Sequence, residues 1–426
     1  MEKMIVHGGR TLSGEIHIQG AKNAVLPILA ACVLIDGKIT LENVPRITDT
    51  FLSIDILQNL GAEIAFHGNT LTLNTHGLKN TPVPEELVSK MRSSIIFMGS
   101  LLGRFGSVSI HYPGGCKLGE RAIDLHIKAL QALGGQFEAN NEKLICNAPF
   151  LAGTDIHLDF PSVGATQNAI LASVYAKGTT IITNAAAEPE ITDLIHFLNG
   201  AGAKIAGAGT NQLVIKGVAS LHHTRHRIMP DRIVAGTYVV AAAITKSNLR
   251  LKGVNPVDMK PITDVFRQMG LDIKYADNDL YVRPPQILRP IEVKTLPHPG
   301  FPTDMQPQLM TLLALADGVS SIEETIFEAR DMHVAELNRM GARIIALESG
   351  AGQTFIIDGV SELTATAQVT GKDLRGGAAL ILAALSAKGS SLIYGLEHVA
   401  RGYEDIFRDL AGVGALIRDG YEEEIA

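Results

Sequence analysis

The residues 111–121 set a thiol between two cations in a glycine-rich stretch. Cys116 follows Gly114 and Gly115 and precedes Lys117 and Arg121. Glycine lets the backbone take positive φ and approach a ligand closely, while neighbouring cations favour the thiolate and attract anionic substrates. The segment therefore predicts a reactive thiol beside an anion site, and a surface loop with an incidental cysteine is the alternative.

Further polar residues stand just before long apolar runs or at junctions between a strand and a helix. Asp231, Asp304 and Asp373 each precede an apolar run, so each suits a helix N-cap, or a base if it meets a hydroxyl. Helix N-termini and cations together bind phosphates and carboxylates. The cations at these positions are Lys22, Arg92, Arg121, Arg330, Arg375 and Arg401.

A sequence repeat that would position these residues occurs six times along the chain. Each copy consists of an apolar helix, a β-branched strand, a junction, a second helix ending in Gly, and paired strands. The closing glycines lie 73, 68, 68, 71 and 73 residues apart and are Gly61, Gly134, Gly202, Gly270, Gly341 and Gly414. Each suits a C′ position in the left-handed conformation. We predict that the fold is built from six copies of this unit.

The first helix of each repeat is apolar nearly all round, which indicates an interior helix wrapped by sheet. We expect an α/β fold with three repeats in each of two domains, one of residues 21–229 and one of residues 1–20 plus 230–426. The first strand should return to complete the second domain. The His-rich residues 221–227 are expected as a solvated linker between the domains, since their spacing matches no strong metal motif.

The composition of the chain excludes several classes of function. The chain of 426 residues is 46% hydrophobic, has no Trp and carries a formal net charge of -7, which argues against a nucleic-acid surface. Cys32, Cys116 and Cys146 form no CxxC pair, which fits a reducing compartment, and Cys32 and Cys146 stand in apolar runs. No signal segment and no run of about 18 apolar residues is present, so a cytoplasmic protein without a membrane association is expected.

The chain resembles the enolpyruvyl transferases over essentially its whole length, and the cysteine loop is similar to that of the branch acting on UDP-N-acetylglucosamine. The resemblance implies an inside-out α/β barrel of two domains and six repeats. The segments that carry it are Gly20-Ala21-Lys22-Asn23-Ala24, Met91-Arg92-Ser93, Pro113-Gly114-Gly115-Cys116, Gly119-Glu120-Arg121, Ser162-Val163-Gly164-Ala165-Thr166, Pro230-Asp231-Arg232, Phe301-Pro302-Thr303-Asp304-Met305, Asp373-Leu374-Arg375 and Arg401-Gly402-Tyr403.

By that resemblance, the enolpyruvyl group of phosphoenolpyruvate moves to the sugar 3′-hydroxyl and phosphate leaves, in the first committed step of peptidoglycan precursor synthesis, with no metal, organic cofactor or obligate protein partner. It implies that Cys116 is the acid and Asp304 the base. It also implies that phosphoenolpyruvate is bound by Lys22, Asn23, Arg121 and Arg401, with Lys22 and Arg401 also catalytic and Asp231, Arg330, Asp373 and Arg375 supporting.

For the nucleotide sugar the resemblance points to a set drawn from both halves of the chain: Arg92, Arg121, Ala122, Ile123, Asp124, Leu125, Phe160, Pro161, Ser162, Val163, Asp304 and Ile326. Four residues depart from the family pattern, namely Phe160, Ala329, Asp331 and Ala400, and Asp331 stands next to Arg330 as a neutralising charge. Two alternatives remain open: transfer to another hydroxyl such as that of shikimate 3-phosphate, and a catalytically silent relative that binds the nucleotide sugar.

Overall fold

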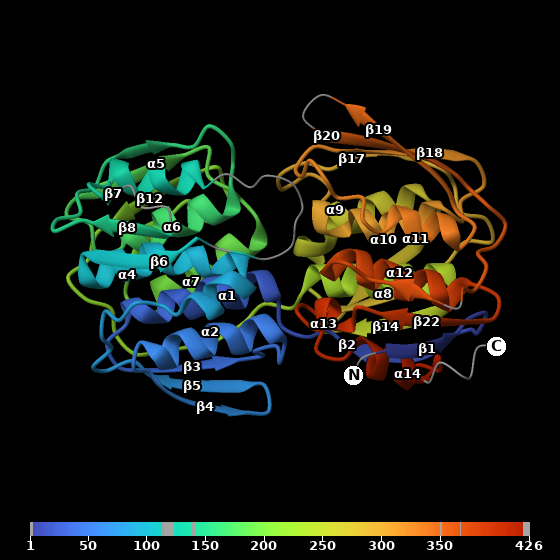
Figure 1. The fold of residues 1–426 in the computed structure, drawn as a ribbon, viewed down its shortest axis with the longest axis horizontal. Coiled ribbons are helices and arrows are strands. Elements are labelled where there is room, and N and C mark those ends of the chain that lie inside the picture. The colour runs from blue at the N-terminus through green and yellow to red at the C-terminus, as the bar shows by residue number, and fades with distance from the viewer. Residues whose placement is uncertain are drawn as a thin grey trace. The chain divides into compact units, whose positions relative to one another are not determined.

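The chain divides into two compact units, each with its own apolar core. The computed structural model describes residues 3–112, 114, 123–138, 142–349, 352–366 and 368–420. Within these ranges the N-terminal unit holds residues between 20 and 229, and the C-terminal unit holds residues 3–19 and 230–420. Each unit is described by itself below (Figure 1).

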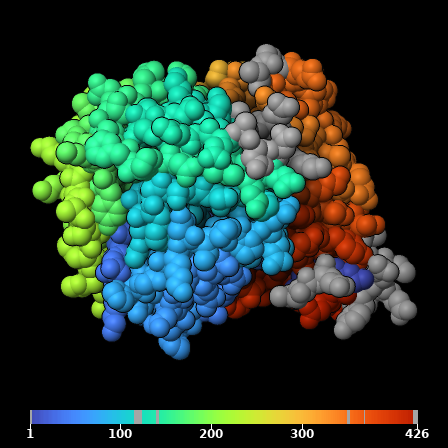
Figure 2. All heavy atoms as spheres, turned by 60° about the vertical axis from the view of Figure 1, so that its left-hand side comes forward, coloured from blue at the N-terminus to red at the C-terminus, as the bar shows by residue number. Residues whose placement is uncertain are grey.

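The N-terminal unit is built on helices whose interior members are almost wholly buried. In α6, for example, every residue from Ala165 to Ser173 is buried, and α4 packs against it. Figure 2 shows one face of this unit, where residues coloured blue to green form a packed surface. Its helical segments are α1 (Lys22–Ala31), η1 (Cys32–Leu34), α2 (Thr48–Asn59), α3 (Glu85–Lys90), η2 (Arg92–Ile96), α4 (Phe97–Phe105), α5 (Asp124–Ala132), α6 (Val163–Ser173) and α7 (Pro189–Gly200).

Three sheets accompany these helices. In the first and third, an edge strand runs parallel to its neighbour and the other pairings are antiparallel; in the second, all pairings are antiparallel. The strand orders are β13 (Thr224–Arg227), β3 (Lys38–Glu42), β5 (Thr70–Asn74), β4 (Glu63–His67); β6 (Ser107–His111), β8 (Lys143–Asn147), β7 (Gln136–Glu138); and β11 (Lys204–Ala206), β12 (Gln212–Lys216), β10 (Thr179–Thr183), β9 (Asp155–His157).

The C-terminal unit places three buried helices side by side, α8, α10 and α12 (Figure 1). Every residue of α8 is buried, because its sequence is apolar on all faces. The helical segments are α8 (Arg232–Ile244), α9 (Pro256–Gln268), η3 (Thr303–Met305), α10 (Gln306–Leu313), α11 (Val334–Arg339), α12 (Leu374–Ser386), α13 (Leu396–Val399) and α14 (Ile406–Gly412).

The sheets of this unit repeat one strand order, in which a parallel edge strand precedes three antiparallel strands. The orders are β2 (Ser13–His17), β14 (Asn248–Lys252), β16 (Asp279–Arg283), β15 (Asp272–Ala276); β17 (Glu292–Lys294), β18 (Val319–Glu324), β20 (Gly352–Asp358), β19 (Arg343–Ser349); and β21 (Val369–Thr370), β22 (Ser390–Tyr394), β1 (Lys3–His7), β23 (Leu416–Asp419).

Two features expected from the sequence are confirmed. The six closing glycines all have positive φ, between 91° at Gly341 and 106° at Gly134. The first strand also returns as predicted, because β1 pairs with both β22 and β23. The result is a mixed α/β fold of two units, and in the described ranges its sheets are open rather than joined into a closed barrel.

The expected linker at residues 221–227 is wrong in part, because Thr224–Arg227 form strand β13 of the first sheet. Its polar side chains are paired: Arg225 forms an ion pair with Glu42, and Nε2 of His226 lies 2.9 Å from Oδ1 of Asp193. These partners let a polar sequence serve as an edge strand. Among the described residues, no helix has the length and apolarity to cross a membrane.

Candidate functional site

A carboxylate held by two arginines is the main polar feature of the C-terminal unit. Asp304 lies in η3, Arg330 between β18 and α11, and Arg375 in the first turn of α12. Nη2 of Arg330 donates to Oδ1 of Asp304 at 2.9 Å, and Nη2 of Arg375 donates to Oδ2 at 2.9 Å. Both arginine side chains are buried, whereas that of Asp304 is 25% exposed. Buried guanidinium groups need such partners.

This pairing bears on the expectation that Asp304 is a helix N-cap. Burial raises the pKa of the Asp304 carboxyl, but the charges and hydrogen bonds of Arg375 and Arg330 outweigh it and hold that pKa well below its usual range. The side chain caps no helix, since α10 begins after Met305 without a side-chain cap. Asp304 is therefore an ionised, oriented carboxylate, and the N-cap alternative is wrong for this residue.

The other two aspartates are helix caps. Oδ1 of Asp231 accepts from the amides of Ile233 and Val234 at the start of α8. Oδ1 of Asp373 likewise accepts from the amides of Arg375 and Gly376, at 3.0 and 2.9 Å. Each cap satisfies amides that the first helical turn leaves without a partner. The cap at Asp373 also fixes the backbone of Arg375 next to Asp304.

A second layer of buried polar groups lies behind Arg375. The guanidinium of Arg375 lies 5.8 Å from the centre of the Tyr403 ring, and the Tyr403 hydroxyl lies 2.8 Å from Oγ1 of Thr237. Nε2 of Gln308 donates to the same Thr237 oxygen at 3.2 Å. This network ties α8, α10 and the segment after α13 around the arginine, and so limits its movement.

Asp331, the neutralising neighbour expected for Arg330, has another partner. Its Oδ2 accepts from Nε2 of Gln353 at 3.1 Å, while the Arg330 side chain donates to Asp304 and to Thr303. Arg401 is half-buried in the turn after α13, two residues before Tyr403, and Ile326 is half-buried just after β18. The structure thus brings Asp304, Arg330 and Arg375 together in one cluster.

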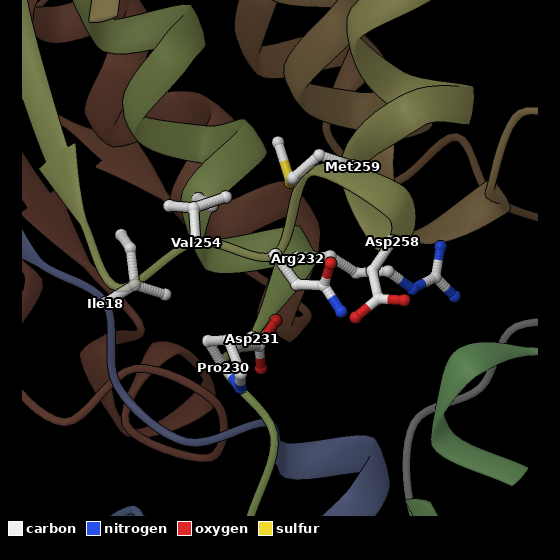
Figure 3. Close-up of a pocket in the computed structure, with 9 residues that line it drawn as sticks. Ile18, Pro230, Asp231, Arg232, Val254, Asp258 and Met259 are labelled. Atoms are coloured by element: carbon white, nitrogen blue, oxygen red, sulfur yellow. The ribbon is translucent and has the colours of Figure 1, made fainter. Parts of the chain in front are cut away.

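A small hollow opens where α8 and α9 begin. Its lining includes Asp231, Arg232 and Asp258, which Figure 3 shows together with Ile18, Pro230, Val254 and Met259. Its volume open to a water-sized sphere is about 0 Å³, whereas ligand pockets measure roughly 300–1,000 Å³. This hollow is too small for a nucleotide sugar.

The N-terminal unit carries its own charged pair. Lys22 is the first residue of α1, and its Nζ lies 2.9 Å from Oδ2 of Asp49 in the first turn of α2. The carboxylate is 1% exposed and the lysine side chain 12% exposed. The pair keeps a cation at the amino end of a buried helix, with Asn23 half-buried beside it. Such a position favours anions.

A buried histidine lies near the other predicted residues of this unit. Oδ1 of Asn168 accepts from the Gly99 amide at 2.7 Å, so its Nδ2 faces Nδ1 of His126, also at 2.7 Å. The network therefore assigns Nδ1 as an acceptor and leaves the ring proton on Nε2. Burial, followed by the charge of Arg92, lowers the pKa of His126 to about 4, against an opposing effect of Asp124.

The first turn of α6 fits against that ring. A Cβ added at Gly164 would lie 2.8 Å from Cε1 of His126, so only glycine fits there. Ser162 caps α6 by accepting from the Ala165 amide at 3.3 Å. Two stretches of the predicted nucleotide-sugar set thus lie close together: residues 123–125 lead into His126, and residues 160–163 lead into Gly164. Pro161 and Val163 are half-buried, and Phe160 is 43% exposed.

The three thiols differ in what the structure describes. Cys116 lies outside the described residues, as do Lys117, Arg121 and Ala122, so the predicted reactive segment has no structural account here. Cys32 and Cys146 are buried, as predicted. Burial raises the pKa of Cys32 above its usual range and that of Cys146 to about 11. Within the described ranges no group of His, Cys, Asp or Glu side chains has the arrangement of a metal site.

Sequence reasoning missed several residues that support these clusters, above all Glu324, Thr303, Asp49 and His126. Asp49 stands at the junction of the first repeat, where other repeats carry Arg330 and Arg401, and that matched position was a usable signal. Glu324 ends a strand, and its sequence neighbourhood gives no sign that it is buried. Only the tertiary arrangement identifies it.

Comparisons with known proteins agree over nearly the whole chain. The family model for EPSP synthase (3-phosphoshikimate 1-carboxyvinyltransferase) matches residues 6–410. UDP-N-acetylglucosamine 1-carboxyvinyltransferase 2 of Caldanaerobacter subterraneus is 44% identical, covering 97% of this chain and 99% of that protein. UDP-N-acetylglucosamine 1-carboxyvinyltransferase 1 of Clostridium acetobutylicum is 46% identical, with 98% and 99% covered.

Solved structures give the same fold. The enolpyruvyl transferase NikO from Streptomyces tendae superposes with a TM-score of 0.89 at 26% identity, covering 98% of each chain. EPSP synthase from Acinetobacter baumannii superposes with a TM-score of 0.74 at 18% identity, covering 98% of this chain and 99% of that one. The second likeness concerns the fold alone.

Proposed function

Because the chain belongs to the EPSP synthase (3-phosphoshikimate 1-carboxyvinyltransferase) family, we propose that it transfers the enolpyruvyl group of phosphoenolpyruvate to the 3′-hydroxyl of UDP-N-acetylglucosamine and releases phosphate. The observation that carries the choice of acceptor is the 44–46% identity to UDP-N-acetylglucosamine 1-carboxyvinyltransferases over 97–98% of the chain. This step would begin peptidoglycan precursor synthesis in the cytoplasm.

The proposed architecture is a six-repeat, inside-out α/β fold with three repeats per domain. The domains would span residues 21–229 and residues 1–20 plus 230–426. The recurring strand order and the buried helices α1, α4 and α6 of one unit and α8, α10 and α12 of the other support this proposal. Sheets on the outside would leave the helix N-termini available to bind anions.

The reaction is an addition followed by an elimination. The methylene carbon of phosphoenolpyruvate gains a proton while the sugar oxygen bonds to the neighbouring carbon, and the adduct then loses a proton and phosphate to restore the double bond. Phosphoenolpyruvate is an enol phosphate and a weak electrophile, so an acid at the methylene carbon and a base at the hydroxyl lower the barrier. We assign Cys116 as the acid and Asp304 as the base.

The Asp304 geometry supports this role with one refinement. The Asp304 side chain is ionised and 25% exposed, so an acceptor hydroxyl could approach the carboxylate beside the two arginines. Its depressed pKa makes Asp304 a weak base towards a free alcohol. The hydroxyl becomes acidic as its oxygen bonds to carbon, so proton uptake would follow the start of C–O bond formation.

The cations are assigned to the leaving and transferring groups. Lys22, Arg121 and Arg401, with Asn23, would bind the phosphate and carboxylate of phosphoenolpyruvate and stabilise the charge on departing phosphate. Asp49 supports this by holding the Lys22 ammonium at 2.9 Å. The nucleotide sugar would bind Arg92, Ile326 and residues 121–125 and 160–163. Asp231, Arg330, Asp373 and Arg375 would support the reacting centre.

Phosphate release from phosphoenolpyruvate tests the proposal. The purified protein should release phosphate with UDP-N-acetylglucosamine and not with shikimate 3-phosphate, and Cys116→Ser should lose this turnover. Release only with shikimate 3-phosphate would replace the acceptor. No release with either, together with binding of the nucleotide sugar, would indicate a silent relative, and undiminished turnover in Cys116→Ser would remove the acid assignment.

A further inference from the structure

Glu324 is a fully buried carboxylate at the end of β18 that accepts four hydrogen bonds. Its Oε1 accepts from Oγ1 of Thr295 at 2.9 Å and from the amides of Ile326 and Phe327 at 2.9 and 3.2 Å. Its Oε2 accepts from Oγ1 of Thr303 at 2.9 Å. A carboxylate with this many donors is firmly oriented. None of the roles assigned above uses it.

The bond to Thr303 fixes the direction of a short relay. A carboxylate only accepts and a guanidinium only donates, so the single hydroxyl hydrogen of Thr303 must point to Glu324. The Thr303 oxygen then accepts from Nη1 of Arg330 at 2.6 Å, and Nη2 of Arg330 continues to Oδ1 of Asp304 at 2.9 Å. Glu324 therefore fixes the direction of the Thr303 hydroxyl hydrogen, so that an oxygen lone pair of Thr303 points to Arg330.

The same carboxylate holds Arg330 from a second side. Its bonds to the amides of residues 326 and 327 fix the turn after β18, and the guanidinium of Arg330 lies 4.9 Å from the centre of the Phe327 ring. That turn also carries Ile326, which we assign to the nucleotide sugar. One buried anion thus organises the arginine that orients Asp304 and a segment of the acceptor site.

We propose that Glu324 is a positioning residue for enolpyruvyl transfer: through Thr303 it sets the Arg330 guanidinium against Asp304, and through the 326–327 amides it shapes the acceptor end of the site. This inference rests on the proposed function and deepens it. Glu324 touches neither substrate in this scheme. Replacing Glu324 should lower kcat because Asp304 loses its orientation.

The chain offers a matched pair of variants, because Thr295 and Thr303 donate to the same carboxylate at the same distance of 2.9 Å. Only Thr303 also accepts from Arg330. Thr303→Val breaks the relay, whereas Thr295→Val removes one bond to Glu324 and the bond that Oγ1 of Thr295 accepts from the Thr325 amide at 3.0 Å, and it leaves the relay from Thr303 to Arg330 intact. Thr303→Ser keeps a hydroxyl and serves as the conservative rescue.

Steady-state kinetics and thermal unfolding are measured on the parent, Glu324→Gln and the three threonine variants. Glu324→Gln and Thr303→Val should lower kcat by up to about 100-fold, the scale of a 1 Å misplacement. Their KM for phosphoenolpyruvate should stay near the parent value, since its proposed ligands lie elsewhere. Thr295→Val should lose thermal stability and keep the parent kcat. Thr303→Ser should have most of the parent kcat, because it keeps the hydroxyl.

If Thr303→Val and Thr295→Val lose the same Tm and Thr303→Val keeps the parent kcat, the proposal is overturned and Glu324 is a structural residue. Thr303→Val removes no charge, so it keeps the test decidable if Glu324→Gln does not fold. Crystal structures of these variants supply a readout independent of turnover. Arg330 should move beyond about 3.5 Å from Oδ1 of Asp304, and an unmoved guanidinium would contradict the relay even if the parent failed to use UDP-N-acetylglucosamine.

Discussion

Arg375 reaches Asp304 across 71 residues of sequence, with its Nη2 at 2.9 Å and its Nε at 3.3 Å from the same Oδ2 atom. Arg330 takes the other oxygen, so the carboxylate is held in one plane and one ionisation state. Guanidinium groups suit this task because their donors are planar and permanently charged. The pairing keeps Asp304 ionised and oriented, which suits its proposed role as a base that takes up a proton once reaction is under way.

Asp304→Asn should lower kcat by roughly 10²- to 10⁴-fold, the usual contribution of a general base. The amide keeps the shape of the side chain but loses the charge that neutralises Arg330 and Arg375. Folding stability should fall by roughly 3 kcal/mol, the lower end for a broken buried pair, because Asp304 is 25% exposed. Steady-state turnover and urea unfolding check both.

Asp279→Asn is the matched control for that substitution. Asp279 is a buried carboxylate of the same unit, held by Arg250 and by the Gly253 amide at 3.2 Å. Its loss should destabilise the protein and leave kcat unchanged. Equal kcat in the parent and Asp304→Asn would remove the base assignment.

The buried His333 should make the protein sensitive to mild acid. Burial lowers the pKa of His333 to about 4, and neither ring nitrogen has a hydrogen-bond partner among the described residues. Between the ordinary histidine pKa of about 6.5 and about 4, the unfolded chain binds a proton that the folded protein does not. The free energy of unfolding therefore falls as the pH falls through this window, by up to about 2 kcal/mol between pH 6.5 and 5.

Urea unfolding across that pH range checks the effect, with His333→Leu as the comparison. The variant lacks the titrating group, so its stability should depend less steeply on pH. His126, whose pKa is also lowered to about 4, contributes equally to both proteins. Identical slopes for the parent and His333→Leu would show that His333 gains its proton in the folded state.

An epoxide such as fosfomycin, or an alkylating reagent at about pH 7.5, should label Cys116 alone in the folded protein. Thiolates are the reactive form, and Cys32 and Cys146 are inaccessible with raised pKa values. Mass spectrometry of digested peptides locates the label. Cys116→Ser should stay unlabelled until it is unfolded in urea, and labelling of Cys146 without denaturant would contradict its burial.

Gly164→Ala should distort the amino end of α6. The added methyl would lie 2.8 Å from the His126 ring, and overpacking of this kind costs roughly 1–3 kcal/mol. Since residues 160–163 are assigned to the nucleotide sugar, the KM for UDP-N-acetylglucosamine should rise more than the KM for phosphoenolpyruvate. Combining it with His126→Ala removes the opposing ring, so the double variant should recover part of the stability, and strictly additive losses would contradict a direct clash.

The sequence predicted the elements better than the contacts between them. Positive φ at Gly341 and Gly134 and the caps at Asp231 and Asp373 follow from local rules of backbone geometry. The return of β1 follows from the repeat pattern, since the residues before Lys22 belong to no full repeat. The partners of Asp304 follow from neither, because Arg330 and Arg375 come from separate elements and either would serve as a surface cation. Their convergence depends on tertiary packing.

The polar strand β13 is a second case in which local sequence did not predict a tertiary contact. Residues 222–226 are histidine-rich and charged, which is typical of exposed connecting segments. Glu42 and Asp193 come from other parts of the N-terminal unit and pair with Arg225 and His226. Local composition predicts a loop whenever the compensating charges are distant in sequence.

The position of β1 between β22 and β23 has a consequence for synthesis on the ribosome. Among the described residues, β1 pairs with residues 390–394 and 416–419, which are translated more than 380 residues later. The N-terminal unit, whose residues fall between 20 and 229, has its strands available much earlier. Folding during translation should therefore finish that unit first, while β1 stays without these partner strands until residues 390–419 have been made.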